Sequence, residues 1–215
     1  MPYIGTQPND VKKNTGLYTP SEILQLTKEG SWGGSLEFIA EETFSSTVSA
    51  IDFTSIKENK YDVHFLTVKN FKSATSNNAT VGIQLYESGT LETSTVYQYA
   101  LQRFSTQPAN QEDKSTSSNI MKTCTTATGG GVGKPFNFYC YLYNLGNSSK
   151  YSFQTSQGFG TDAFAGAGTV MNTHFGGATL PQASLVDGIR VTTGTAVDLA
   201  SFDIKLYGIK ELWVT

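Results

Sequence analysis

The sequence predicts an all-β protein, an antiparallel β-sandwich with a short N-terminal arm and helix. Ten segments between residues 35 and 214 alternate apolar and polar residues and are rich in β-branched and aromatic side chains. Clusters of Gly, Asn and Ser separate these segments, as turns between strands require. A parallel sheet would need crossover helices between its strands, and the pattern after residue 35 predicts none.

The one clear helix signal is "TPSEILQLTKEG", residues 19–30. Thr19 is a good N-cap, Pro20 suits the first helical position, and Glu22 completes a capping box with Thr19. Gly30 supplies a stop at the C-terminal end. We therefore predict a short helix that follows an extended arm.

We predict two parts of the chain, an anchor or assembly segment (1–34) and a sandwich domain (35–215). A helix this short is not stable alone in water, so it must dock on its own domain, a neighbouring copy or a larger assembly. Ile23 and Leu24 on its apolar side, and Trp32 just after it, are the candidate contact residues.

The first five predicted strands lie before residue 105. They are "SLEFIAEE" (35–42), "VSAIDFTSI" (48–56), "YDVHFLTVKNF" (61–71), "ATVGIQLYE" (79–87) and "STVYQYALQRF" (94–104). Apolar residues recur at every second position, which is typical of a strand with one buried face. The turn clusters "SNNA" and "ESGT" flank the fourth strand.

The other five predicted strands follow residue 135. They are "FNFYCYLYNL" (136–145), "KYSFQTSQ" (150–157), "TVMNTHF" (169–175), "SLVDGIRVTTG" (184–194) and "ASFDIKLYGIKELWV" (200–214). The clusters "LGNSSK" and "TTGTA" mark turns between them. Ten short strands with such turns favour a sandwich or a barrel.

Two segments are predicted to be loops. Residues 105–133 are polar and glycine-rich, and only "SNIMKTCT" within them could form a further strand. Residues 156–169 mix small residues with Phe159 and Phe164, which would either tuck under the loop or form a contact surface. Connections this long are usually functional or loosely ordered.

The last predicted strand carries apolar residues close to the end of the chain. Phe202, Ile204 and Leu206 alternate with polar residues and are expected to face the core. Pairing this strand in the middle of a sheet would protect it from edge-to-edge aggregation. Trp213 lies beyond the strand, and we predict that it packs against the N-terminal helix or a neighbouring subunit.

Composition excludes several classes of partner. The net charge is −3 and charged residues make up only 15% of the chain, so there is no basic stripe for nucleic acid. No apolar run approaches the ~20 residues of a membrane-spanning helix, so we expect no membrane insertion. The start "MPYIGTQPND" lacks the charged and apolar regions of a signal peptide, so a protein that acts outside a cell would need to leave it without this export signal. Release by cell lysis would provide such a route.

The cysteines and histidines do not predict a metal site. Cys124 and Cys140 with His64 and His174 are too far apart in sequence to make a zinc pattern. The favoured interpretation makes both cysteines small apolar residues in or beside strands, although the sequence leaves a Cys124–Cys140 disulfide open. Each histidine lies in a strand pattern typical of a half-exposed position.

No catalytic or cofactor-binding residues are predicted. The chain has no Gly-x-Ser-x-Gly elbow, and "TGGGVGKP" fails as a phosphate loop because Thr128 and Pro135 occupy positions that need Gly and a hydroxyl residue. A glycosidase needs two carboxylates about 5 to 10 Å apart. Spacing selects no pair among the aspartates that a β scaffold could bring together: Asp52, Asp62, Asp187, Asp198 and Asp203.

Aromatic residues keep a sugar-binding hypothesis open. Trp32, Tyr97, Tyr99, Tyr141 and Tyr143 could stack on sugar faces, although strand tyrosines are more often core-edge residues with a solvated hydroxyl. The candidate glycan contacts are these residues: Tyr97, Tyr99, Phe159 and Phe164.

Four passages carry a family likeness. "MPYIG", "GLYTPSEILQL…GSWGGSLEFI", "VSAIDFTSI…YDVHFLTVKN" and "ASFDIKLYGIK" resemble virion proteins of tailed bacteriophages, particularly phages of marine bacteria and cyanobacteria. In that family the third of these passages opens a jelly-roll-like β-sandwich, and the fourth closes it. The Gly or Ser-Gly usual before the final strand is replaced here by "VDLA", and residues 105–133 match no motif.

The resemblance implies a structural virion protein and transfers no active-site residue. Such proteins commonly assemble as homotrimers, in tail fibres or tips that meet the host surface, or as head decorations. We expect a tail-associated, non-enzymatic subunit whose residues 1–34 join other virion proteins and whose sandwich meets a host-surface glycan. The alternatives are a head decoration or cement protein, a free carbohydrate-binding module and a hydrolase.

Overall fold

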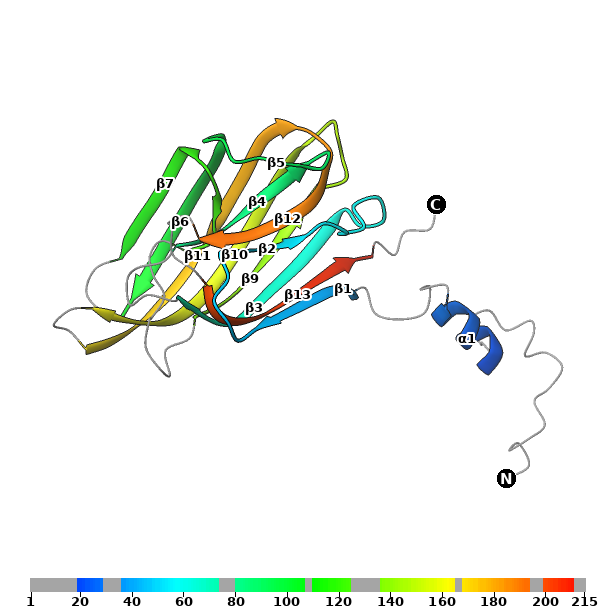
Figure 1. The fold of residues 1–215 in the computed structure, drawn as a ribbon, viewed down its shortest axis with the longest axis horizontal. Coiled ribbons are helices and arrows are strands. Elements are labelled where there is room, and N and C mark those ends of the chain that lie inside the picture. The colour runs from blue at the N-terminus through cyan, green and yellow to red at the C-terminus, as the bar shows by residue number, and fades with distance from the viewer. Residues whose placement is uncertain are drawn as a thin grey trace, which may run out of the picture. The chain divides into compact units, whose positions relative to one another are not determined.

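The computed structural model describes residues 19–28, 36–73, 80–106, 110–124, 136–164, 168–193 and 199–210. The chain divides into two compact units, Met1–Ser35 and Leu36–Thr215. The first unit contains the helix α1 (Pro20–Lys28), drawn in blue in Figure 1.

The capping box predicted for α1 is present. The Thr19 amide donates to Oε2 of Glu22 over 2.7 Å, and the Glu22 amide donates to Oγ1 of Thr19 over 3.3 Å. These two bonds satisfy amides that the first turn of a helix leaves without intrahelical partners. The sequence therefore placed the start of the helix correctly.

The second unit is built from antiparallel strands, as Figure 1 shows. The strands in the described ranges are β1 (Leu36–Phe44), β2 (Ala50–Phe53), β3 (Val63–Ser73), β4 (Val81–Glu87), β5 (Thr90–Leu91), β6 (Tyr97–Ser105), β7 (Gln111–Ser118), β8 (Met121–Lys122), β9 (Phe136–Tyr143), β10 (Tyr151–Phe164), β11 (Gly168–Ala183), β12 (Val186–Thr193) and β13 (Leu199–Ile209). The predicted all-β antiparallel class is confirmed.

Two sheets form a sandwich with jelly-roll connectivity. One sheet has eight strands in the order β1-β13-β3-β9-β10-β11-β6-β7, and the other has five, β2-β12-β4-β5 with β8 on β4. Four pairs join strands from opposite ends of the chain: β1 with β13, β2 with β12, β3 with β9, and β4 with β8. A chain folded as one long hairpin and rolled up gives these pairs, which define a jelly roll.

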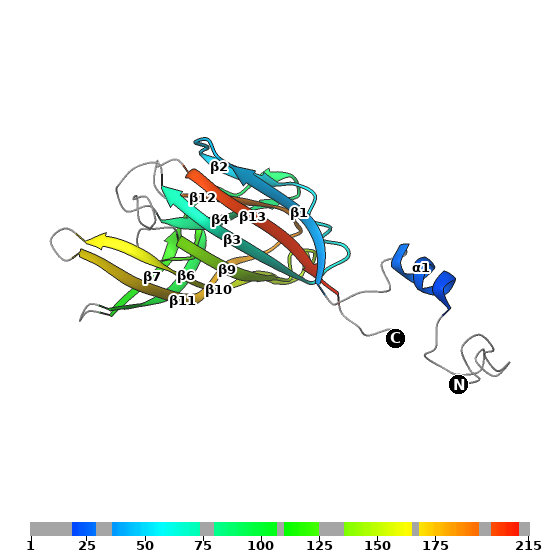
Figure 2. The ribbon, with the colours of Figure 1, turned by 90° about the horizontal axis from the view of Figure 1, so that it is seen from below.

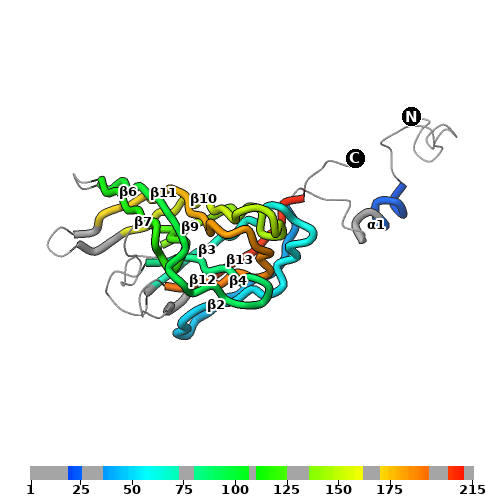
Figure 3. Tube along the Cα trace, turned by 90° about the horizontal axis from the view of Figure 1, so that it is seen from above, coloured from blue at the N-terminus to red at the C-terminus, as the bar shows by residue number. Residues whose placement is uncertain are grey.

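Two insertions extend one sheet of the jelly roll. The strands β5, β6 and β7 come between β4 and β8, and β10 with β11 comes between β9 and β12. Because β10 pairs with β9, and β11 pairs with β6, the insertions add four strands to the β1-β13-β3-β9 sheet. Figures 2 and 3 show β6, β7, β10 and β11 on the side of the sandwich away from β1.

Both predicted loops contain strands, which corrects the sequence-based expectation. Within residues 105–133 the structure contains β7, which was not predicted, and β8, which lies in the segment "SNIMKTCT" that the sequence left open as a strand. Residues 156–164 and 168–169 belong to the paired strands β10 and β11. The strand β7 was missed because it is an edge strand with the sequence QEDKSTSS, exposed at most positions, and so lacks apolar alternation. The two strands of the β10–β11 hairpin were predicted in part, as 150–157 and 169–175, and the rest of β10 was missed because small residues such as the buried Gly158 interrupt the apolar alternation there.

The core lies between the two sheets. The strand β13 lies between β1 and β3 in mid-sheet, as predicted, and its Ile204 and Leu206 are fully buried. The side chain of Phe202 is outside the described part. Other fully buried apolar side chains come from both sheets: Leu66, Ile83, Leu85, Phe136, Leu142 and Leu180.

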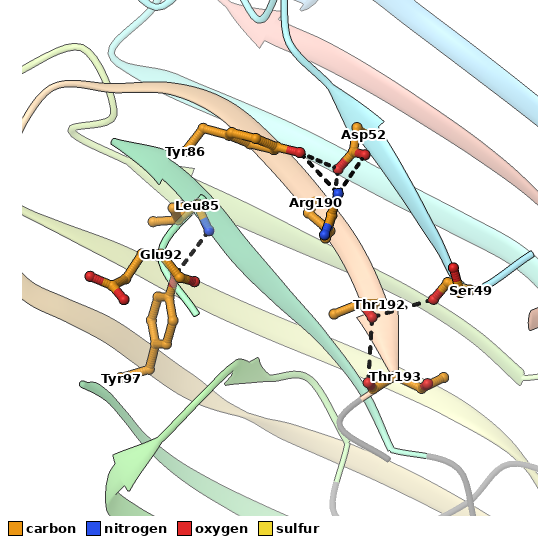
Figure 4. A network of polar contacts seen from close by, with 9 residues as sticks. All are labelled: Ser49, Asp52, Leu85, Tyr86, Glu92, Tyr97, Arg190, Thr192 and Thr193. Carbon is orange, nitrogen blue, oxygen red and sulfur yellow. Dashed lines mark hydrogen bonds and ion pairs between the residues drawn. The ribbon is translucent and has the colours of Figure 1, made fainter. Parts of the chain in front are cut away.

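A buried tyrosine ties the first insertion to the jelly roll. The Tyr97 side chain is 0% exposed, and its hydroxyl donates to the Glu92 carbonyl over 3.1 Å. The Leu85 amide donates to the same hydroxyl over 3.0 Å (Figure 4). One phenol therefore joins β4, β6 and the connection between them, and burial raises its pKa far above the usual range.

Replacing Tyr97 should destabilise the sandwich. Tyr97→Phe removes the hydroxyl and leaves the buried Leu85 amide without its acceptor, which costs about 1–3 kcal/mol. Urea unfolding monitored by tryptophan fluorescence measures the change. Tyr151→Phe, at an exposed position of β10, is the matched control and should change the free energy of unfolding by less than about 0.5 kcal/mol. Equal effects of the two variants would contradict this role of Tyr97.

Candidate functional site

The outer face of the eight-stranded sheet, turned away from the five-stranded sheet, is the candidate functional surface. Of the large apolar side chains that are exposed in the described part of the chain, all but Leu24 and Leu185 lie on it. They are Leu36, Phe38, Phe104, Tyr139, Tyr151, Phe153, Phe159, Met171 and Phe175. Such a concentration on one face is typical of an interaction surface.

One row of aromatic rings crosses four strands of this face. Strand register places Phe38 opposite Tyr207, Tyr207 opposite Phe65, and Phe65 opposite Tyr141. Their ring centroids are 5.9, 6.2 and 4.8 Å apart in that order. We call these four residues, together with Leu36 at the start of β1, the aromatic half of the face.

The same row continues with small residues on the inserted strands. Thr155 lies opposite Tyr141, Gly177 opposite Thr155, Ala100 opposite Gly177, and Lys114 opposite Ala100. Small side chains between larger neighbours leave a depression in the sheet surface. Thr155, Gly177 and Ala100 form its floor.

Aromatic side chains stand on both sides of this floor. On one side Phe153 and Tyr143 line a depression of about 870 Å³ that runs over β9, β10, β11, β6 and β7. On the other side Phe175 and Tyr139 line a neighbouring depression of about 320 Å³. The two depressions share Thr155, and we call them together the groove.

Neutral polar groups complete the groove. Gln98 and Thr116 line it, and neither makes a side-chain hydrogen bond with the described residues. The Tyr143 hydroxyl lies 3.4 Å from Oγ1 of Thr155. Lys114 is the charged residue of the lining, and its Nζ lies 2.7 Å from a carboxylate oxygen of Glu112. The groove therefore combines aromatic walls with amide and hydroxyl groups and a neutralised cation.

The predicted glycan contacts divide between the two faces. Tyr97 is fully buried, so its ring does not reach the outer surface. Tyr99 is half-buried and its hydroxyl donates to Asp113 over 3.0 Å, but it is among the residues that line the larger depression. The prediction is therefore wrong for Tyr97, whereas for Tyr99 it stays a prediction. Phe159 lies on the outer face and is 49% exposed. The Phe164 side chain lies outside the described part.

The other predicted contact residues belong to the helix and the chain ends. In α1 the Ile23 side chain is half-buried and Leu24 is 55% exposed. Trp32 and Trp213 lie outside the described residues. Tyr141 and Tyr143, which the sequence suggested for sugar stacking, do lie on the outer face.

Sequence reasoning missed the residues that shape the groove. In "KYSFQTSQ" the aromatic and polar residues alternate, and alternation alone would turn Tyr151 and Phe153 toward the core. The structure instead buries Ser152 and Gln154 and exposes the aromatic rings. In this segment Gln and Ser recur between the aromatic residues. That pattern fits a strand that buries its aromatic side chains and equally one that buries its polar side chains.

The histidines are buried, which corrects the expectation of half-exposed positions. His64 and His174 are 0% and 1% exposed. A ring nitrogen of His64 lies 2.8 Å from the Ile56 carbonyl oxygen, and the His174 ring meets Phe136 edge-on at 5.5 Å. Burial lowers the pKa of His64, and burial with the nearby Arg103 charge lowers the pKa of His174 to about 4.

Both cysteines are buried and free. The favoured interpretation of small core residues is therefore confirmed, and the disulfide left open by the sequence is absent. Burial raises the pKa of Cys124 to about 11 and that of Cys140 still further. A thiol with so high a pKa carries almost no thiolate at neutral pH and is a poor nucleophile.

Asp52, one of the candidate carboxylates, belongs to an ion-pair network on the five-stranded sheet (Figure 4). Arg190 donates to its two oxygens over 2.6 and 2.8 Å, and the Tyr86 hydroxyl donates to Oδ1 over 2.8 Å. Hydrogen bonding from Arg190, with a further bond from Tyr86, lowers the pKa of this carboxyl. An ionised, bidentate carboxylate of this kind joins β2 to β12 and is not a proton donor at neutral pH.

Two further features limit the chemistry of the described residues. Within them, no group of three His, Cys, Asp or Glu side chains is placed to hold a metal ion. Their helices also include none with the length and apolar character needed to cross a membrane.

Comparisons with known proteins do not assign the chain to a family. No family model, no curated protein and no solved structure matches it. The resemblance to phage virion proteins accordingly stays a prediction from the quoted motifs.

The buried histidines should make stability depend on pH. Both have a folded pKa below the unfolded value of 6.5, so the unfolded chain binds their protons first as pH falls. The free energy of unfolding should decrease from about pH 6.5 to about pH 4, by on the order of 3 kcal/mol for His174. The acidic groups with lowered pKa lose their contribution at the acid end of this interval and below it, since Glu37 and Glu92 titrate in the unfolded chain near 4.5 and Asp52 near 3.8.

Urea unfolding at half-unit pH steps checks this dependence. His174→Gln keeps a polar side chain without a titrating group, and its stability should fall less steeply than that of the wild type across this interval. Parallel slopes for the two proteins would contradict the assignment to His174.

Proposed function

We propose that the protein is a structural, non-enzymatic subunit of the virion of a tailed bacteriophage. It is part of the tail, assembles with copies of itself and displays the jelly-roll sandwich on the particle. The family resemblance of the quoted motifs supports the virion assignment. The observation that carries the assembly role is the exposure of Leu36 and Phe38 beside the row of aromatic rings, because exposed apolar patches mark interaction surfaces.

The aromatic half is the contact surface between copies. Leu36 and Phe38 are 47% and 53% exposed, and Phe38 continues the row of rings through Tyr207. Burying exposed aromatic and aliphatic groups contributes about 25 cal/mol per Å² of apolar area, the main favourable term in association. The resemblance implies three copies around one axis.

The connectivity places this contact surface where the chain enters and leaves the sandwich. Leu36, the first residue of β1, pairs with Ile209, the last residue of β13. Residues 1–34 and Trp213 are therefore joined to the sheet at the same end of neighbouring strands. An anchor at this edge would hold the aromatic half toward the particle and leave the β6–β7 edge for display.

The chemistry of the described residues fits a binding and assembly role. The cysteines and histidines of the chain are buried, and burial moves their pKa away from that of a nucleophile or base, as in Cys140 and His174. Asp52 is committed to Arg190 by two hydrogen bonds. Cys140 and His174 are part of the buried interior, and Asp52 joins two strands at the surface of the five-stranded sheet.

Removing one exposed ring should weaken association. We expect Phe38→Ser to raise the dissociation constant between copies at least about tenfold, since aromatic residues dominate interface energetics. Unfolding of the isolated chain should change by less than about 1 kcal/mol, because the side chain is half exposed. Sedimentation velocity across a concentration series measures the association.

Leu185→Ser is the matched control, at an exposed apolar position outside the outer face. It should associate like the wild type. A wild-type protein that stays monomeric at 100-fold its working concentration, or a Phe38→Ser variant that associates normally, would rule out this interface.

Deleting residues 1–34 should separate folding from incorporation. The truncated chain keeps all described strands, so it should retain the wild-type β-sheet circular dichroism and a cooperative unfolding transition. It should be missing from purified particles when it replaces the full chain in infected cells. Quantitative mass spectrometry of separated heads and tails gives the readout, and normal incorporation of the truncated chain would refute the anchoring role.

A further inference from the structure

We infer that the groove on β6, β7, β10 and β11 binds an uncharged glycan chain. The inference deepens the proposed function, and it rests on that function for the display of this part of the sheet. The aromatic walls would stack on sugar rings, and the amide and hydroxyl groups of the lining would bond to sugar hydroxyls.

The shape of the groove suits a chain-like ligand. Its two depressions share Thr155 and lie on an open sheet surface, where they cross five strands from Tyr143 to Thr116. A compact metabolite is usually enclosed on most sides by its site. An open groove that runs across strands instead accepts an extended molecule whose ends project beyond it.

The walls supply the apolar part of sugar recognition. A pyranose ring presents a face of C–H groups and an edge of hydroxyl groups, so it suits a flat ring beside polar side chains. Phe153 and Phe175 are 45% and 43% exposed, so their rings are open to a ligand. Phe175 is held by stacking on Phe104, with centroids 5.5 Å apart, and is therefore already oriented.

The polar groups of the lining supply the hydrogen-bonding part of sugar recognition. Gln98 and Thr116 make no side-chain hydrogen bond with the described residues, so their donors and acceptors are open to ligand hydroxyls. On the Phe175 side, the Tyr139 hydroxyl donates to Oε1 of Gln157 over 2.6 Å. That bond leaves the Gln157 amide nitrogen as a donor beside the ring.

The charge of the groove favours a neutral ligand. Acidic polysaccharides and single-stranded nucleic acids both need cations along the binding surface. Lys114 is the cation of the lining, and Glu112 neutralises it at 2.7 Å. No other lysine, arginine or histidine lines either depression among the described residues.

Packing limits the residues of the floor at Gly177 less severely than it does at the neighbouring Gly176. A Cβ added at Gly177 would lie 3.1 Å from the Gln154 carbonyl oxygen and would meet no other atom within 4 Å. At Gly176, by contrast, a Cβ would lie 2.2 Å from the Ala100 carbonyl oxygen, so packing requires that glycine. The absence of a side chain at Gly177 keeps the groove open, which a ligand requires.

The groove also lies on strands that the jelly roll does not need. Its floor and two of its four aromatic wall residues, Phe153 and Phe175, come from strands that the two insertions contribute. The other two, Tyr139 and Tyr143, lie on the adjoining jelly-roll strand β9. Additions to a complete fold are common places for binding sites. The aromatic half, by contrast, lies on the jelly-roll strands themselves.

Binding of neutral glycans by the full-length protein tests the inference. The probes are an array of neutral oligosaccharides and native affinity electrophoresis in gels that contain laminarin, dextran, mannan or galactan, with alginate as the anionic comparison. We expect retardation by at least one neutral polysaccharide and none by alginate. Phe153→Ala, which removes a wall, and Ala100→Leu, which fills the floor, should each lower the association constant at least about tenfold.

Phe38→Ser provides the matched control, because it removes an exposed ring from the same face outside the groove. It should keep glycan affinity within about twofold, while Phe153→Ala should leave association between copies unchanged. The inference is overturned if no neutral glycan binds, if alginate binds as well as the neutral probes, or if both groove variants bind like the wild type. Dissociation of the assembly by Phe153→Ala would overturn it too, since a second copy would then occupy the groove.

The two proposals fail in distinguishable ways. Loss of the glycan result leaves the association and incorporation experiments untouched. A protein that binds glycans through the groove but neither self-associates nor enters particles would be a free carbohydrate-binding module. Each outcome thus identifies which proposal is wrong.

Discussion

The antiparallel pairing of β9 with β10 joins the jelly roll to the strands that extend it. Its register sets Phe153 against Tyr143 and Thr155 against Tyr141, and β11 and β6 follow from there. Because side chains alternate between faces, a shift of one residue would turn Phe153 inward and expose the buried Gln154. The position of the small residues beside the aromatic row therefore depends on this one ladder.

The two sides of that ladder have different interiors. On β9 the inward residues Phe138, Cys140 and Leu142 are buried apolar groups, whereas on β10 they are the buried polar residues Ser152 and Gln154. Burying polar groups costs free energy unless they are hydrogen-bonded, so β10 itself gains little from apolar packing. The buried apolar side chains of the extension come from β6 and β11, as with Tyr97, Ala178 and Leu180. The extension is therefore held to the jelly roll by strand pairing together with these buried side chains, an arrangement that suits a binding surface added to a scaffold.

Sequence patterns predicted the scaffold well and the site poorly. Alternation in β13 correctly placed Ile204 and Leu206 in the core, because an apolar run with polar neighbours allows one orientation. On β10 the same logic failed, because aromatic residues face out where Ser152 and Gln154 are buried. The groove also needs residues from five strands, and pairings at long sequence separation, such as Ala100 with Gly177, leave no local signal.

The central claim is that the sandwich is held at its β1–β13 edge and displays its β6–β7 edge. A cryo-electron microscopy map of the phage tail that carries this protein tests it most directly. The account predicts copies around a common axis with Phe38 at the contacts between them, and with the groove beside Phe153 open to solvent. A map in which another protein covers the groove while Phe38 faces solvent would contradict it.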